Sequence, residues 1–396
     1  MRGVTGVSTS SRPRLTAIRA AAVFDGHASL PAGSVVVLDG PTVHSVQPSP
    51  PEGADVVDFP GATVLPGLVD PHVHLAFDSS WDPVGALAVR DDEAALAAMV
   101  AAGRAALRGG VTTVRDLGDR DFLSLPLRGR PDLPTLVAAG PPLTCDRGHC
   151  HYLGGCVGTG PSALRDAVRT HAERGVDVIK IMASGGTLTP GTRQESSQFT
   201  RDELAAAVDE AHRLGLPVTA HAHGTGAVAD AVAAGVDGME HVSFWSTDGV
   251  DSPLDLMREI ADRGVLVGAT LGVMPVPGAT PPPPVASRLP TITANTRRLL
   301  SLGARVIAGT DAGIAPIKPP DALRWAYAEL IDLGLTPAAA LRRITADAAS
   351  VLGLGSTKGR LVPGHDADLL VVAGDPLVDP AALHSVQAVY RAGALA

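Results

Sequence analysis

Residues 65–75 read LPGLVDPHVHL, a short apolar run that ends in a His-x-His pair. The run predicts a buried β-strand. Side chains two positions apart on a strand point to the same face, so His72 and His74 would direct their imidazoles at one point. Two neutral imidazoles there suit a divalent transition metal. A single His-x-His pair is weak support for a metal site, so the rest of the chain must supply further ligands.

Similar apolar runs recur along the chain and alternate with Ala-rich segments, several of which end in glycine, as helix C-termini do. The runs span residues 63–74, 111–118, 134–140, 177–186, 217–224, 238–244, 265–272 and 305–313. Eight such units over roughly 250 residues are typical of an α/β fold, the (β/α)8 or TIM barrel. Nearly continuous apolar runs favour parallel strands that are buried on both faces.

Both ends of the chain have a different texture, with short β-type runs separated by turn residues. We therefore expect a disordered tail at 1–13 and a small composite β-sandwich domain that both termini form, from 14–65 plus 356–396. The (β/α)8 barrel would span 66–355. Within it, residues 274–290 are rich in proline, which predicts a long loop at the barrel mouth and no helix.

The bulk composition excludes some functions. The chain has 32 Lys and Arg against 41 Asp and Glu, a formal net charge of −9, and no basic block, which argues against a nucleic-acid partner. No secretory h-region and no apolar stretch of membrane-spanning length occur, so we expect a cytoplasmic protein with no membrane contact. Cys145, Cys150 and Cys156 are expected to be reduced thiols. We also expect a homo-oligomer that acts on a small-molecule substrate.

Barrel active sites lie at the C-terminal ends of the strands, and polar residues occupy those ends here. They are His72, His74, Arg115, Asp116, Lys180, His221, His223, His241 and Asp311. Each has a structural explanation on its own: a hydrogen-bonded histidine, a surface lysine on an edge strand, an aspartate that caps a helix. Their joint placement on one rim is harder to explain in that way.

The set indicates a two-metal hydrolytic centre. His72 and His74 would hold one ion, and a histidine of 217–224 with His241 would hold the other. An ammonium group at Lys180 would be repelled by two dications. The conflict disappears if its amine takes up carbon dioxide, because a carbamate has two oxygens that can bridge metals about 3.5–4 Å apart. We expect Zn2+, with Mn2+, Co2+ or Fe2+ as alternatives.

The chain resembles the amidohydrolase superfamily in its binuclear form with a carboxylated lysine. The similarity rests on VLPGLVDPHVHL, the lysine of VIKIMASGG, TAHAHG, GMEHVS, AGTDAG and KGRLVPGHDADLLVV, in that order. RGHCHYLGG (147–155) narrows it to the branch of imidazolonepropionase-related enzymes, Xaa-Pro and Xaa-Arg/Lys dipeptidases and ochratoxin-degrading enzymes. The resemblance favours His221 over His223 as the metal ligand on the fifth strand and leaves His223 near substrate.

Substrate contacts are expected from the loops 119–131, 145–158, 186–199 and 274–290. His149, His151 and Tyr152 follow the third run and could hold a scissile carbonyl or a substrate carboxylate, or they could serve the loop structure alone. Arg193, in the loop after the fourth run, could pair with a substrate carboxylate.

These features predict a metal-dependent hydrolase that cleaves an amide bond in a peptide-like, N-acyl amino acid or cyclic substrate, by attack of a metal-bridging hydroxide. Asp311 would bind one metal and shuttle a proton to the leaving amine. Ester, lactone or phosphotriester hydrolysis and cyclase or lyase chemistry on the same metals are alternatives. A non-catalytic scaffold is disfavoured because no ligand is missing.

Overall fold

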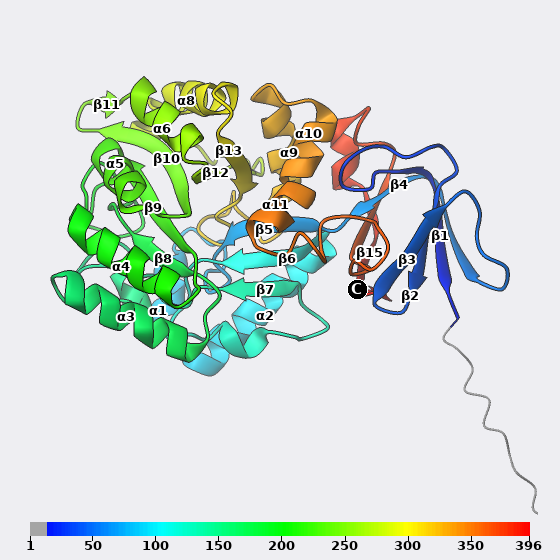
Figure 1. The fold of residues 1–396 in the computed structure, drawn as a ribbon, viewed down its shortest axis with the longest axis horizontal. Helices are drawn as coiled ribbons and strands as arrows, with labels where there is room; N and C mark the ends of the chain where they lie inside the picture. The colour runs from blue at the N-terminus through cyan, green and yellow to red at the C-terminus, as the bar shows by residue number, and fades with distance from the viewer. Residues whose placement is uncertain (1–13) are drawn as a thin grey trace, which may run out of the picture.

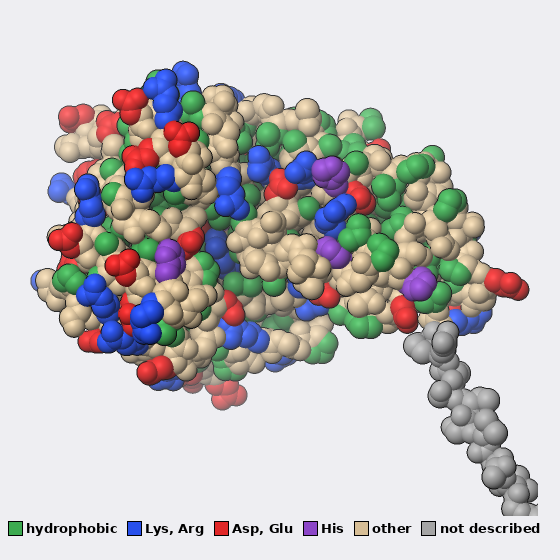
Figure 2. Space-filling model, in the orientation of Figure 1, with side chains coloured by type: hydrophobic (Ala, Val, Ile, Leu, Met, Phe, Trp, Pro, Cys, Tyr) green, Lys and Arg blue, Asp and Glu red, His purple; other side chains and the backbone are tan. Residues whose placement is uncertain are grey.

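The computed structural model describes residues 14–396 (Figure 1). The predicted disordered tail at 1–13 lies outside the described residues. Within the described part, no helix has both the length and the apolar character needed to cross a membrane. Acidic and basic side chains are intermixed on the face that Figure 2 shows.

Both ends of the chain contribute to one seven-stranded sheet, on the right of Figure 1. Its order is β16–β15–β14–β4–β1–β2–β3. The strands are β1 (Thr16–Val23), β2 (Val35–Asp39), β3 (Thr42–Gln47), β4 (Asp55–Pro66), β14 (Leu369–Ala373), β15 (Val386–Arg391) and β16 (Ala394–Leu395). The ends join where β14 runs antiparallel to β4, with Val371 opposite Val64. The two ends of the chain therefore share one sheet, as predicted. The sandwich and its domain limits stay predictions.

Eight further strands overlap the eight predicted apolar runs and form two parallel sheets. One sheet contains β5 (Leu68–Val73), β6 (Val111–Asp116) and β7 (Thr135–Ala138). The other contains β8 (Ile179–Met182), β9 (Val218–Gly224), β10 (Gly238–Ser246), β12 (Leu266–Thr270) and β13 (Arg305–Gly309), with the short β11 (Gly249–Val250) paired to β10. Isolated parallel bridges join Val73 to Ala312 and Leu143 to Ile181. These bridges connect the two sheets at both of their edges.

Helices follow most of these strands and pack outside them (Figure 1). They are α1 (Pro83–Ala88), α2 (Asp92–Arg108), α3 (Pro161–Arg174), α4 (Arg201–Arg213), α5 (Thr225–Ala234), α6 (Leu254–Asp262), α8 (Leu289–Ser301), α9 (Leu323–Asp332), α10 (Pro337–Arg343) and α11 (Ala346–Val351). Helix α4 begins with a capping box, in which Thr200 and Glu203 satisfy each other's backbone N–H groups. The connection from β6 to β7 departs from the alternation, because it contains only the 3-10 turn η1 (Leu125–Leu127).

The expectation that 274–290 contains no helix is wrong. Helix α7 (Pro283–Ala286) lies in it, and α8 begins at Leu289, before its end. Proline is compatible with the first helical turn, where its missing N–H would have no intrahelical partner and its φ is already suitable. Pro283 and Pro284 stand in that first turn, so the segment keeps one short helix despite its composition.

Candidate metal centre

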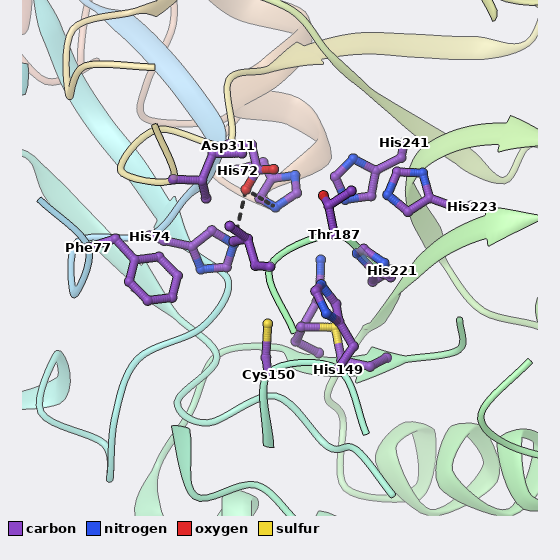
Figure 3. Close-up of a pocket in the computed structure, with 14 residues that line it drawn as sticks. His72, His74, Phe77, His149, Cys150, Thr187, His221, His223, His241 and Asp311 are labelled. Carbon is purple, nitrogen blue, oxygen red and sulfur yellow. Dashed lines mark ion pairs between the residues drawn. The ribbon is translucent and has the colours of Figure 1, made fainter. Parts of the chain in front are cut away.

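The first cluster of candidate ligands joins the end of β5 to the residues after β13 (Figure 3). Oδ1 of Asp311 lies 3.4 Å from Nε2 of His72 and 3.2 Å from Nε2 of His74. All three side chains are buried. One donor atom from each lies within 4.8 Å of the others, a spacing that a single ion can bridge. The structure therefore brings together the His-x-His pair and Asp311, as the strand-end argument predicts.

Asp311 is held in an unusual backbone conformation. Its φ is +60°, in the left-handed region, and its N–H donates a 2.7 Å hydrogen bond to the carbonyl oxygen of His72. The preceding Thr310 donates its hydroxyl to the buried carboxylate of Asp70, at 2.6 Å. A left-handed non-glycine residue costs on the order of 1 kcal/mol or more and persists where its surroundings enforce it. These bonds to β5 fix the direction of the Asp311 side chain.

The second cluster contains His221, His223 and His241, whose donor atoms lie within 4.8 Å of one another. Nδ1 of His223 lies 2.7 Å from Oγ of Ser243, and Nδ1 of His241 lies 2.6 Å from Oγ1 of Thr270. These contacts leave Nε2 of both rings for another partner. The structure thus places both histidines of β9 beside His241, so the preference for His221 as the ligand stays a prediction.

Burial makes these imidazoles suitable ligands. The pKa values of His221 and His241 lie well below the usual value because burial and the neighbouring histidines disfavour the cationic form. Burial likewise lowers the pKa of His223, to about 4. A neutral imidazole keeps the lone pair that a metal needs. Burial opposes ionisation of Asp311, but His72, His74 and Lys180 outweigh it and hold its pKa well below the usual range.

Lys180 is a buried lysine whose amine is unpaired among the described residues. It lies on β8, is 1% exposed, and its Nζ has no hydrogen-bond partner among the described residues. Burial lowers its pKa to about 8, so about a tenth of the amine is neutral at pH 7, far more than for an ordinary lysine. A buried amine without a partner, beside two clusters of metal-type donors, fits a group that binds carbon dioxide and then a cation. The residues present therefore fit the predicted binuclear centre.

Glu240 is a residue of the site that the sequence pattern does not predict. It stands on β10 directly before His241 and is fully buried, with Oε2 3.1 Å from Nδ1 of His72. Its Oε1 accepts hydrogen bonds from Nη2 of Arg115, at 2.9 Å, and from Oγ1 of Thr219, at 2.8 Å. Burial opposes its ionisation, yet His72, Arg115 and Lys180 hold the pKa of Glu240 well below its usual value. A carboxylate in this position orients a metal-binding imidazole.

The two polar residues of β6, Arg115 and Asp116, bond to protein groups around the site. The guanidinium of Arg115 donates hydrogen bonds to Glu240 and to the carbonyl oxygen of Pro71. Asp116 accepts from the backbone N–H groups of Leu75 and Gly118. Both residues therefore support the loops and side chains around the site.

The predicted substrate contacts separate into two groups. His149 lines the cavity, with its ring centroid 4.7 Å from that of His221 and Nδ1 3.1 Å from Oγ1 of Thr189. His151 and Tyr152 belong to the 3-10 turn η2 (His151–Leu153) and lie outside the cavity lining. Nδ1 of His151 instead lies 3.0 Å from the carbonyl oxygen of Gly148.

Arg193 also lies outside the cavity lining. Its side chain is 73% exposed and lies 3.4 Å from Glu195. Cys150 does line the cavity, with a thiol whose pKa burial raises to about 12, so it is protonated. Cys145, Cys150 and Cys156 are free thiols in the structure.

The two clusters and Lys180 share one cavity of about 50 Å³ (Figure 3). Histidine, lysine, aspartate and threonine side chains line it, together with the thiol of Cys150 and four apolar side chains. The lining residues are His72, His74, Phe77, His149, Cys150, Lys180, Met182, Thr187, Leu188, His221, His223, His241, Asp311 and Ile314.

Comparison with known proteins gives a consistent result. Residues 63–395 match the amidohydrolase family. The chain is 28% identical to the ochratoxinase of Aspergillus niger over 354 residues, covering 80% of this chain and 71% of the relative. It is 29% identical to the imidazolonepropionase of Deinococcus radiodurans over 440 residues, covering 98% of each chain.

Among solved structures, a Xaa-Pro dipeptidase with methionine bound in its active site has a TM-score of 0.82 and 26% identity to this chain. The match covers 96% of this chain and 99% of the dipeptidase. The resemblance predicted from the motifs is confirmed: this chain belongs to the amidohydrolase family.

Proposed function

We propose that this protein hydrolyses an amide bond in a peptide-like, N-acyl or cyclic substrate. Membership of the amidohydrolase family makes it a hydrolase that acts on carbon–nitrogen bonds. The observation that carries the finer proposal is the convergence of six candidate ligands on one buried cavity. They are His72, His74, Lys180, His221, His241 and Asp311.

These six residues would hold two divalent ions, with His72 and His74 on one and His221 and His241 on the other. Bound ions would supply a water of lowered pKa and polarise the scissile carbonyl. Zn2+ is the first choice because nitrogen and carboxylate ligands suit it, while Mn2+, Co2+ and Fe2+ accept similar ligands.

Lys180 would carry the carbamate. Its neutral amine would attack carbon dioxide: a C–N bond forms, one C=O π bond becomes an oxyanion, and the nitrogen releases one proton to water. The pKa of about 8 for Lys180 supports this step, because only the unprotonated amine is nucleophilic.

Asp311 would move the proton. Its low pKa keeps the carboxylate ionised at neutral pH, so it can accept a proton from the attacking water and give it to the leaving nitrogen. His149 and His223, both neutral at that pH, line the same cavity and would donate hydrogen bonds to the carbonyl oxygen as negative charge develops.

The relatives favour amide cleavage over the alternatives. One of them is named a Xaa-Pro dipeptidase, a class that cleaves peptide bonds. Ester, lactone or phosphotriester hydrolysis and cyclase or lyase chemistry would use the same residues, and product analysis separates them. A non-catalytic scaffold is disfavoured by the complete ligand set.

The finer architectural proposals rest on the same observations. The bridges at both edges of the parallel sheets support a closed (β/α)8 barrel over 66–355. The shared sheet of both termini supports a second domain built from 14–65 plus 356–396. A cytoplasmic location and a homo-oligomer remain predictions.

The test is a hydrolysis screen on protein reconstituted separately with zinc, manganese or cobalt. We expect release of free amine from at least one class among N-acyl amino acids, dipeptides, simple N-alkyl amides and cyclic amides. Metal analysis should give close to two ions per chain. Lys180→Ala serves as the control that removes the bridging group. Metal-loaded protein that cleaves no amide, or protein that binds no metal, would overturn the proposal.

A further inference from the structure

We propose that the part of the substrate beside the scissile amide is apolar and uncharged, and that the enzyme selects against a free carboxylate there. This inference rests on the proposed amide hydrolysis and narrows its substrate class. It separates simple apolar amides from the dipeptides and N-acyl amino acids that the family resemblance would equally allow.

The first argument is space. The cavity at the two clusters, of about 50 Å³, has room for only a few water molecules. Only the reacting amide group can reach the metal candidates. The flanking groups of the substrate must therefore leave past the side chains that bound the cavity on its non-metal side.

The second argument is the chemistry of that side. Phe77, Met182, Leu188 and Ile314 line it. The side chains of these four residues belong to, or pack against, one apolar cluster that also contains Cys150. Leu188 and Ile314 are half-buried, so they are the apolar members that an entering substrate group would meet and cover, beside the exposed Thr187 of the same lining. Burying such a surface favours an alkyl or aryl group by ~25 cal/mol per Å².

The third argument is the placement of charge. Lys180 is the only lysine or arginine among the lining residues, and it lies with the metal candidates. The backbone of Arg193 packs against Gly185, whose carbonyl oxygen lies 3.0 Å from Nε2 of His221. Its guanidinium nevertheless points to solvent and toward Glu195.

A carboxylate pressed against Leu188 and Ile314 would thus lose hydration without meeting a cation. Such uncompensated burial costs several kcal/mol for an ion. An uncharged group of the same shape has no such cost and gains from the apolar contact. The expected selectivity follows from this difference.

A matched substrate pair tests the inference: N-benzoyl-L-leucine and N-(3-methylbutyl)benzamide, which differ only in the carboxylate. With zinc-reconstituted wild-type protein we expect kcat/KM for the neutral amide to be at least about tenfold higher, equivalent to ~1.4 kcal/mol. Equal or higher kcat/KM for the carboxylate substrate would overturn the inference while leaving amide hydrolysis intact.

Variants identify the side chain responsible. Leu188→Arg supplies a cation at the apolar wall and should shift the preference toward the carboxylate by about tenfold, whereas the volume-matched Leu188→Met should keep the wild-type ratio. Arg193→Ala should also keep that ratio. A loss confined to the carboxylate substrate in Arg193→Ala would show that Arg193 turns inward to bind it, and would overturn the inference.

Calorimetric binding of both compounds separates this inference from the proposed function. If neither compound is cleaved, the proposal that the protein hydrolyses such amides is wrong. The binding preference alone then decides whether the site selects against a carboxylate. Tighter binding of the neutral amide then supports the apolar wall, and tighter binding of the carboxylate refutes it.

Discussion

Glutamine in place of Glu240 would expose how the protein prepares His72 for a metal. Oε2 of the carboxylate lies 3.1 Å from Nδ1 of His72, out of line for a hydrogen bond, and its charge favours the tautomer with the proton on Nδ1, which leaves the Nε2 lone pair toward Asp311. In Glu240→Gln the amide oxygen can still accept from Arg115 and Thr219. Its NH2 group would then face Nδ1 as a donor, favouring the tautomer with the proton on Nε2. That nitrogen would have no lone pair for an ion.

The expected loss is about 10–100-fold in affinity for the ion at His72 and His74, the range for such supporting carboxylates. This corresponds to ~1.4–2.7 kcal/mol. The substitution also leaves the buried Arg115 without its negative partner, so we expect a lower melting temperature. The metal and stability effects must therefore be measured separately.

Zinc affinity is measured by competition with a chromophoric chelator, on protein shown to be folded by circular dichroism. Glu210→Gln is the matched control, because Glu210 is also buried and bonded to arginines, Arg169 and Arg213, but does not line the cavity. It should lose stability and keep zinc affinity. If Glu240→Gln binds zinc within about twofold of the wild type, the tautomer argument is wrong.

Three further predictions concern the residues of the cavity. Asp311→Asn keeps shape and one ligating oxygen but loses basicity, so we expect folded protein that retains the ion at His221 and His241 and turns over at least ~10²-fold more slowly; near-normal turnover would exclude the proton shuttle. Lys180→Ala should lose bound metal, measured by elemental analysis, and regain part of it with a short-chain carboxylic acid, whereas full metal content without the acid would contradict a bridging role. Because the pKa of Lys180 is about 8, the neutral amine rises from about 10% at pH 7 to about 90% at pH 9. At matched dissolved carbon dioxide, carbamate formation in metal-free protein, followed by 13C NMR, should therefore be faster at pH 9 by roughly ninefold, and a pH-independent rate would refute the pKa argument.

Strand ends explain why much of the site could be predicted. Parallel strands bring their C-terminal ends to the same edge, so a polar residue that closes an apolar run is placed without knowledge of the loops. His72, Lys180, His241 and Asp311 follow that logic and line one cavity. The histidines of β9 show its limit, since two residues on the same face both fall beside His241.

Other features depend on contacts that a single sequence does not reveal. Glu240 stands inside GMEHVSF, and a charged residue within a buried run was the available signal, but its partners come from β5, β6 and β9. Arg193 shows the opposite case, in which a loop residue expected to bind substrate turns its side chain to solvent. Side-chain direction in a loop is set by local turns and neighbours, which composition does not encode.

The pairing of β4 with β14 has a consequence for how the chain is made. Strand β5 follows β4 almost at once, yet one edge of β4 pairs with β14, which is synthesised only near the C-terminus. At translation rates of about 5–20 residues per second, that edge stays unpaired for an order of tens of seconds. An apolar strand with a free edge is a template for wrong pairing. Nascent chains of this protein should therefore depend on chaperones late in synthesis, and truncations that remove β14 should aggregate even though every residue of the cavity is present.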